Sequence, residues 1–156
     1  MTQEQDFLRE AIALADANID AGGRPFGAVV VRDGAVVATG VNAIHATNDP
    51  TAHAEMNAIR AAARAIGSPD LGDCAVYASG HPCPMCMAAM RMAGISSVAY
   101  AYSNEDGAPF GLSTAAIYAE LALPFAEQSM TIGHMPPAGG GAALYERWAQ
   151  AAAAGR

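Results

Sequence analysis

The chain has 156 residues, 53% of them hydrophobic and 15% charged, which is typical of one ordered domain and excludes a disordered protein. Its formal net charge of −7, with only eight Lys and Arg residues, argues against a nucleic-acid partner. No apolar run is long enough to cross a membrane, and the polar, acidic start lacks the features of a signal peptide. Three cysteines, two of them in a metal-type motif, favour a reducing compartment. We therefore expect a cytoplasmic protein with a single domain over residues 1–156.

The first part of the chain predicts a helix and then a β-hairpin. Apolar residues recur at helical spacing between Phe7 and Ala15, and Gly22-Gly23 ends this helix. Two β-branched runs, at 26–31 and 35–41, flank Asp33-Gly34, a dipeptide that strongly favours a hairpin turn.

Phe26 begins this hairpin and Asn42 follows it. Phe26 is either a core aromatic residue or one that presents its face to a flat ring. Asn42 is either a turn residue or an amide that reads the edge of a base, because an amide carries both donors and an acceptor.

The next segment predicts a helix that carries an H-x-E motif, made by His53 and Glu55. Asp49 is suited to be the N-cap and Pro50 the first residue of this helix, which continues to about Ile66. On an ideal helix, side chains two residues apart point about 200° from each other. The two can therefore share a site only in a distorted first turn, or if Glu55 reaches round.

A strand at 74–79 leads into a P-C-x-x-C motif over residues 82–86. Its prolines suit the first turn of a helix, and a spacing of three puts Cys83 and Cys86 on one helical face. The positive end of a helix also favours thiolates. A strand at 97–102 follows, and the strand–helix–strand order predicts a parallel strand pair with a ligand site at the strand ends.

The rest of the chain begins with a polar loop at 103–111 that holds Glu105 and Asp106. After it we expect a helix, a weak strand, a Pro/Gly-rich linker and a final helix, at 113–121, 129–134, 135–141 and 142–154.

The two motifs together match the zinc-deaminase signature H-x-E…P-C-x-x-C. A catalytic zinc ion keeps three protein ligands and leaves its fourth position to water, and His53, Cys83 and Cys86 supply these three. The reaction also needs a group that moves a proton from water to a ring nitrogen and to the leaving amine, and Glu55 is the candidate.

Two other readings of the cysteines are open. Cys83 and Cys86 could form a redox pair, but this interpretation leaves the H-x-E motif unexplained. A structural zinc site needs a fourth ligand, for which four residues are available: Cys74, His45, His81 and His134. Cys74 opens an apolar run, which is more typical of a buried core thiol.

On the stretches 25–29, 48–55 and 82–86, the chain resembles the cytidine/deoxycytidylate deaminase superfamily, and within it the small bacterial guanine deaminases. The resemblance implies a three-layer α/β/α fold with a mixed, roughly five-stranded sheet, a homodimer, and one zinc ion per subunit. By position it implies zinc ligands at His53, Cys83 and Cys86, a proton shuttle at Glu55, and base contacts from Phe26, Asn42 and the backbone N–H of Ala54.

Two departures concern the substrate. His81 stands where guanine deaminases of this type usually have Glu, and Ser113-Thr114 stands where they use an acid. Asp106, or Glu105 beside it, can supply an acid from the same loop. We expect hydrolytic deamination of a free nucleobase, with guanine to xanthine and ammonia as the leading reaction. The alternatives are cytosine, isocytosine, an aminotriazine or a nucleoside, then tRNA adenosine, which the acidic charge disfavours, and a non-catalytic zinc-binding module.

Overall fold

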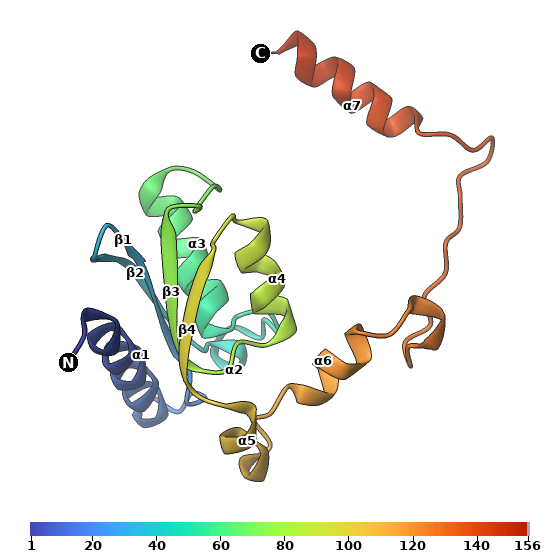
Figure 1. Ribbon diagram of the computed structural model, residues 1–156. Helices are drawn as coiled ribbons and strands as arrows, with labels where there is room; N and C mark the ends of the chain where they lie inside the picture. Colours follow the sequence, from blue (N-terminus) through green and yellow to red (C-terminus); the bar gives the residue numbers. More distant parts are fainter. Residues whose placement is uncertain (156) are drawn as a thin grey trace. The chain divides into compact units, whose positions relative to one another are not determined.

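The computed structural model describes residues 1–155 (Figure 1). The chain divides into two compact units, Met1–Ala122 and a second unit that begins at Leu123. Every predicted zinc ligand and base contact lies in the first unit. The expectation of a single domain over the whole chain stays a prediction.

A mixed sheet forms the centre of the first unit. Its strands are β1 (Gly27–Arg32), β2 (Ala35–Val41), β3 (Cys74–Gly80) and β4 (Ser97–Tyr102), in the order β2-β1-β3-β4. β1 runs antiparallel to both β2 and β3, whereas β3 and β4 are parallel, as predicted. Asp33 and Gly34 both have positive φ (52° and 74°), the conformation of the tight hairpin turn that this dipeptide favours.

Helices cover both faces of the sheet, which confirms the three-layer α/β/α fold (Figure 1). The helix α1 (Gln3–Asp20) packs its Phe7, Leu8 and Leu14 on the face that carries Val29, Val31 and Tyr77. The opposite face, with Val30 and Val76, packs against α3 (Ala54–Ile66) and α4 (Pro84–Met92). Successive strand residues point to opposite faces, so β1, β3 and β4 contribute to both cores.

Gly40 of β2 allows the start of α3 to lie directly on the sheet. A Cβ atom at this position would overlap the carbonyl oxygen of Ala54 and the backbone nitrogen of Ala58. This close approach holds the first turn of α3, and with it the H-x-E motif, against the ends of the strands.

The expectation of about five strands is wrong, because the sheet has four within residues 1–155. The predicted strand at 129–134 has no regular secondary structure. Met130 and Ile132 are exposed, and no strand of the described chain pairs with the segment. A strand is stabilised mainly by packing against neighbouring strands, and the described part of the chain provides no strand beside this segment.

The predicted start of the α3 helix is also wrong. Asp49 does not cap a helix, because its carboxylate accepts hydrogen bonds from the backbone N–H and the hydroxyl of Thr51 (2.8 and 2.7 Å). A one-turn helix, α2 (Ile44–Thr47), precedes this turn, and α3 begins only at Ala54. The competing local hydrogen bonds of an Asp side chain explain the shift.

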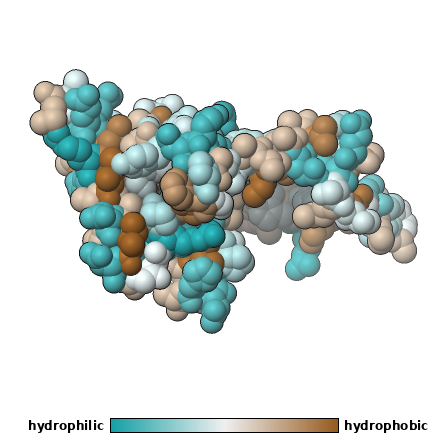
Figure 2. Space-filling model, turned by 90° about the horizontal axis from the view of Figure 1, so that it is seen from below, coloured by the Kyte–Doolittle hydropathy of each residue, from teal (hydrophilic) through white to brown (hydrophobic). Residues whose placement is uncertain are grey.

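The remaining elements are short helices and the final helix. The loop after β4 contains α5 (Asn104–Gly107) and the 3₁₀ turn η1 (Ala108–Phe110), and α6 (Ala115–Leu121), η2 (Phe125–Glu127) and α7 (Ala143–Ala154) follow. Hydrophobic side chains lie exposed among hydrophilic ones on the face shown in Figure 2. In the part of the chain described here, no helix has the length and apolar character needed to cross a bilayer.

Candidate active site

Two helix starts meet at the predicted metal-binding motifs. His53 is the N-cap residue of α3 and Cys83 the N-cap residue of α4, and both have extended backbone (φ −72°, ψ 156° and φ −70°, ψ 166°). Neither side chain caps its own helix, so both are free for other partners. Because the chain changes from extended to helical backbone at His53, the 200° separation of an ideal helix does not apply to His53 and Glu55.

The three predicted ligands form one compact group. Sγ of Cys83 lies 3.4 Å from Nδ1 of His53 and 3.5 Å from Sγ of Cys86, and Sγ of Cys86 lies 3.7 Å from the same Nδ1. Zinc bonds of about 2.3 Å to sulfur and about 2.1 Å to nitrogen, at tetrahedral angles, place such donors about 3.5–3.8 Å apart. One imidazole and two thiols at these separations fit zinc.

The described residues add no fourth protein ligand to this group. The ligand atoms that lie within 4.8 Å of one another come from His53, Cys83 and Cys86 alone. Sγ of Cys74 faces the carboxylate of Asp73 at 3.7 Å, and Nδ1 of His81 lies 3.1 Å from Nδ2 of Asn104. His45 and His134 are outside the group as well. A site with three protein ligands is the open, catalytic type.

Contacts within the group shift the pKa values of its members in different directions. The pKa of Cys83 is lowered to about 4, because its sulfur lies within hydrogen-bond distance of Sγ of Cys86 and of the His53 imidazole. The same contact with Cys83, together with burial, raises the pKa of Cys86. The pKa of His53 is raised by its hydrogen bond with Cys83. The lowered pKa of Cys83 favours its thiolate, the form that binds zinc.

Glu55 lies directly beside the cluster. Its side chain is buried (6% exposed), and its Oε2 accepts a hydrogen bond from the Cys86 thiol at 3.5 Å. Burial raises the pKa of this carboxyl group. A raised pKa suits a buried carboxyl group to general acid–base catalysis.

A cavity of about 270 Å³ opens next to the cluster. His53, Cys83 and Glu55 form one part of its wall. Other parts come from Phe26, Asn42 and the segment Gly111–Thr114. Among the described residues that line this cavity, Glu55 is the only one with a carboxyl group. The space is large enough for a single nucleobase.

The predicted base contacts are brought together only in part. Phe26 and Asn42 both line the cavity. Asn42 is buried (4% exposed), and its Oδ1 accepts from the N–H of Ile44 at 3.2 Å. Ala54 is fully buried at the start of α3 and is not among the lining residues, and its N–H is one of those that a helix start leaves without an intrahelical partner.

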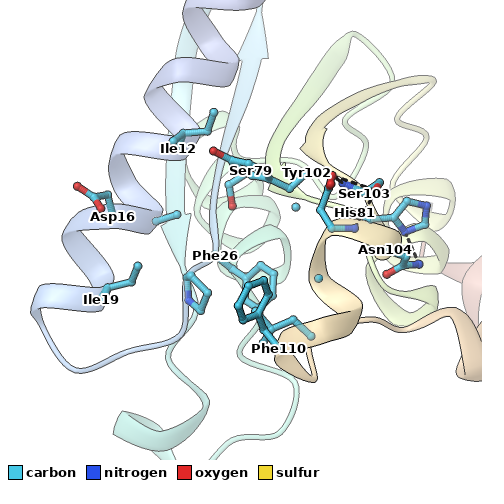
Figure 3. A pocket seen from close by; sticks show the side chains of 16 residues that line it. Ile12, Asp16, Ile19, Phe26, Ser79, His81, Tyr102, Ser103, Asn104 and Phe110 are labelled. Atoms are coloured by element: carbon cyan, nitrogen blue, oxygen red, sulfur yellow. Dashed lines mark hydrogen bonds between the residues drawn. The ribbon is translucent and has the colours of Figure 1, made fainter.

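Asp106 lies on a different cavity, of about 280 Å³, bordered by α1 and the α5 region (Figure 3). Its carboxylate accepts hydrogen bonds from the backbone N–H and the hydroxyl of Ser103 (2.8 and 3.0 Å), which closes a capping box at α5. These hydrogen bonds lower its pKa. The structure therefore does not bring Asp106 together with the His53–Cys83–Cys86 cluster.

Sequence reasoning missed two features of the cavity wall. Nδ2 of Asn104 donates to Nδ1 of His81, as drawn in Figure 3, and Oδ1 of Asn104 accepts from the N–H of Thr114 at 3.0 Å. Asn104 thus joins the end of β3 to the Ser113-Thr114 segment, and nothing in the sequence signals this contact. Arg24 also lines the cavity. The sequence signal for this residue is that Arg24, one of few cationic residues in an acidic chain, directly precedes Pro25-Phe26.

Comparison with known proteins agrees with this geometry. Residues 1–102 match the family described as the cytidine and deoxycytidylate deaminase zinc-binding region. Guanine deaminase of Bacillus subtilis (strain 168) is 44% identical over 127 residues, which are 81% of each chain. The X-ray structure of guanine deaminase from Bacillus subtilis aligns with a TM-score of 0.87 and 39% identity, covering 94% of this chain and 93% of that one. The chloroplastic tRNA(adenine(34)) deaminase of Arabidopsis thaliana is 38% identical over 104 residues, which are 67% of this chain and 8% of that protein.

Proposed function

Since this chain belongs to the cytidine and deoxycytidylate deaminase family, we propose that it removes the amino group of a free nucleobase by hydrolysis, converting guanine to xanthine and ammonia. The observation that carries the proposal is the open His53–Cys83–Cys86 donor set beside a buried carboxyl, at a cavity large enough for one base. The similarity to guanine deaminase of Bacillus subtilis, over most of both chains, supports guanine as the base.

Zinc, when bound by His53, Cys83 and Cys86, lowers the pKa of a coordinated water to about 7 and so provides the nucleophile. Glu55 then carries the protons. Its carboxylate accepts a proton from the attacking water and donates it to the ring nitrogen beside the amino-bearing carbon. After the carbon–oxygen bond has formed, Glu55 moves the second water proton to the amine, and the carbon–nitrogen bond breaks as ammonia leaves.

Phe26 and Asn42 hold the base in this proposal. Both residues line the cavity, as does the Gly111–Thr114 segment. The face of an aromatic ring stacks on a flat base, and the Asn42 amide nitrogen, which has no partner among residues 1–155, is available to donate to an acceptor on the base. The N–H of Ala54, at the positive end of α3, would then stabilise negative charge on a carbonyl or ring nitrogen.

The second candidate substrate is a pyrimidine. It is isocytosine, which carries the same carbonyl, N–H and amino groups as the six-membered ring of guanine, or cytosine. The neutral Ser113-Thr114 wall favours cytosine in particular. Glu55 is the only carboxyl group among the described lining residues, and cytosine, unlike guanine, has no ring N–H next to its amino-bearing carbon that needs a second acceptor. Polar groups of an active site discriminate strongly between substrates when a wrong base leaves them without a hydrogen-bond partner. The cavity wall therefore leaves pyrimidines as competitors.

We also propose a homodimer in the cytoplasm. Large apolar side chains are exposed on α6 and on the turn before it, among them Phe110, Ile117 and Leu121. An apolar surface of this kind is commonly covered by a partner. The three cysteines are free, which suits a reducing compartment. The net charge of −7 gives no support to an RNA substrate.

The test is a panel of amino-substituted bases scored by ammonia release from the zinc-loaded protein. We expect guanine to have the highest kcat/KM, with isocytosine and cytosine lower and adenine at background. Guanine ranking below a pyrimidine would replace the purine assignment by the second candidate. No ammonia from any base on the panel would refute the proposed deaminase.

A further inference from the structure

An unpaired cation lies at the cavity. Arg24 lines the cavity together with Glu55, His53 and Cys83. Within residues 1–155, no carboxylate forms an ion pair with its guanidinium. A guanidinium without an acid beside a binding cavity is available for a substrate.

The backbone of Arg24 is tied to both proposed base contacts. Nδ2 of Asn18 donates to the carbonyl oxygen of Arg24 at 2.7 Å and to that of Asn42 at 3.0 Å. The N–H of Phe26 donates to the same Arg24 carbonyl at 2.8 Å. A Cβ atom at Gly23 would overlap the Asn18 amide, so this junction is closely packed. The backbone of Arg24 is therefore held in a fixed position relative to Phe26 and Asn42.

The chemistry of guanine suits such a cation. When the amino-bearing carbon C2 faces Glu55, the O6 and N7 atoms lie on the far side of the ring system. Both are hydrogen-bond acceptors, and arginine donates to this pair of atoms with two N–H groups in the commonest specific contact to guanine. Adenine presents an amino donor in place of O6, so the same arginine disfavours it.

We propose that Arg24 is a specificity-determining residue that donates two hydrogen bonds to the O6 and N7 edge of the purine. This assignment rests on the proposed deamination of guanine. It accounts for how a cavity with a neutral Ser113-Thr114 wall selects guanine. The selectivity comes from a cation that reads the acceptor edge of the base, and an acid that reads its donor edge is not required.

The experiment compares three substrates in the wild-type enzyme and in Arg24→Met. Guanine offers both acceptors, 7-deazaguanine lacks N7, and isocytosine keeps the carbonyl but lacks the second ring. In the wild type, we expect kcat/KM for guanine to exceed that for 7-deazaguanine about tenfold. In Arg24→Met, kcat/KM for guanine should fall about 10- to 100-fold, and the preference for guanine over 7-deazaguanine should disappear.

Two further variants sharpen the comparison. Arg24→Lys keeps the charge but not the planar fork, so it should also lose the N7 preference. Arg64→Met removes an exposed arginine in the last turn of α3, outside the cavity, and should retain wild-type kinetics. Zinc content and the urea midpoint of unfolding should be unchanged in all three variants.

An N7 preference that persists in Arg24→Met, or an equal loss on all three substrates, would overturn the role of Arg24 while leaving guanine deamination intact. A wild-type enzyme that does not deaminate guanine at all would refute the proposed function, and the assignment of Arg24 with it.

Discussion

His53 and Cys83 occupy equivalent positions on two different helices, and their ligand atoms lie 3.4 Å apart. Each residue is the N-cap of its helix, with extended backbone and a side chain that does not cap. The first turns of α3 and α4 therefore point toward one place. Their partial positive charges favour thiolates there, in addition to the effect of a bound metal.

Replacing Glu55 with Gln should separate zinc binding from catalysis. The amide cannot move protons, and general acid–base groups contribute about 100- to 10,000-fold to rates, so kcat should fall within that range. Metal analysis should find one zinc ion per chain, as in the wild type. Ammonia release within tenfold of the wild-type rate would contradict the role of Glu55 as proton carrier.

Replacing Cys83 with Ala should remove both the metal and the activity, because two ligands do not hold a catalytic zinc ion as three do. The matched control is Cys74→Ala, which removes a buried thiol that is outside the ligand group. This variant should keep its zinc content, measured by elemental analysis. The ligand set would be wrong if the two variants lost equal amounts of zinc.

Cobalt(II) in place of zinc should report an open coordination position. With three protein ligands, the visible absorption spectrum should change when a nucleobase analogue is added, because the fourth position exchanges. A spectrum typical of four protein ligands, unchanged by any analogue, would instead indicate a closed structural site.

Gly40→Val should lower stability and disturb the active site together. The added side chain would overlap the backbone of Ala54 and Ala58, so the start of α3 must move away from β2. We expect a loss of about 1–3 kcal/mol in the free energy of unfolding, measured by urea denaturation, and weaker zinc binding. Gly133→Ala is the control, because a Cβ there meets open space. An unchanged urea midpoint in Gly40→Val would show that this contact is not a constraint.

Asp106→Asn tests whether this acid reads the substrate or caps a helix. Its carboxylate bonds with Ser103 and lies on the neighbouring cavity, so we expect kcat/KM for guanine to stay within about threefold of the wild type. A capping contribution is modest and local. A large loss of guanine turnover at constant zinc content would restore Asp106 as a base contact.

The local signals in the sequence were enough for most of the fold and for the chemistry. The Asp33-Gly34 turn, the alternating strands and the two Pro residues at α4 act over a few residues, so they are readable without the structure. The ligand types at His53, Cys83 and Cys86 were readable for the same reason, because zinc chemistry restricts them. Guanine as the leading base came from resemblance rather than from any local signal.

Only the tertiary structure decided how these pieces meet. The side-chain directions of His53 and Glu55 depend on where α3 begins, and this start moved to Ala54 because Asp49 formed its own turn with Thr51. A strand at 129–134 needed a neighbour that the described chain does not provide. Asp106 lines a cavity other than the one beside the zinc ligands, and Arg24 lines the same cavity as His53 and Cys83, because segments far apart in sequence pack together. Such contacts are non-local, so no window of the sequence contains them.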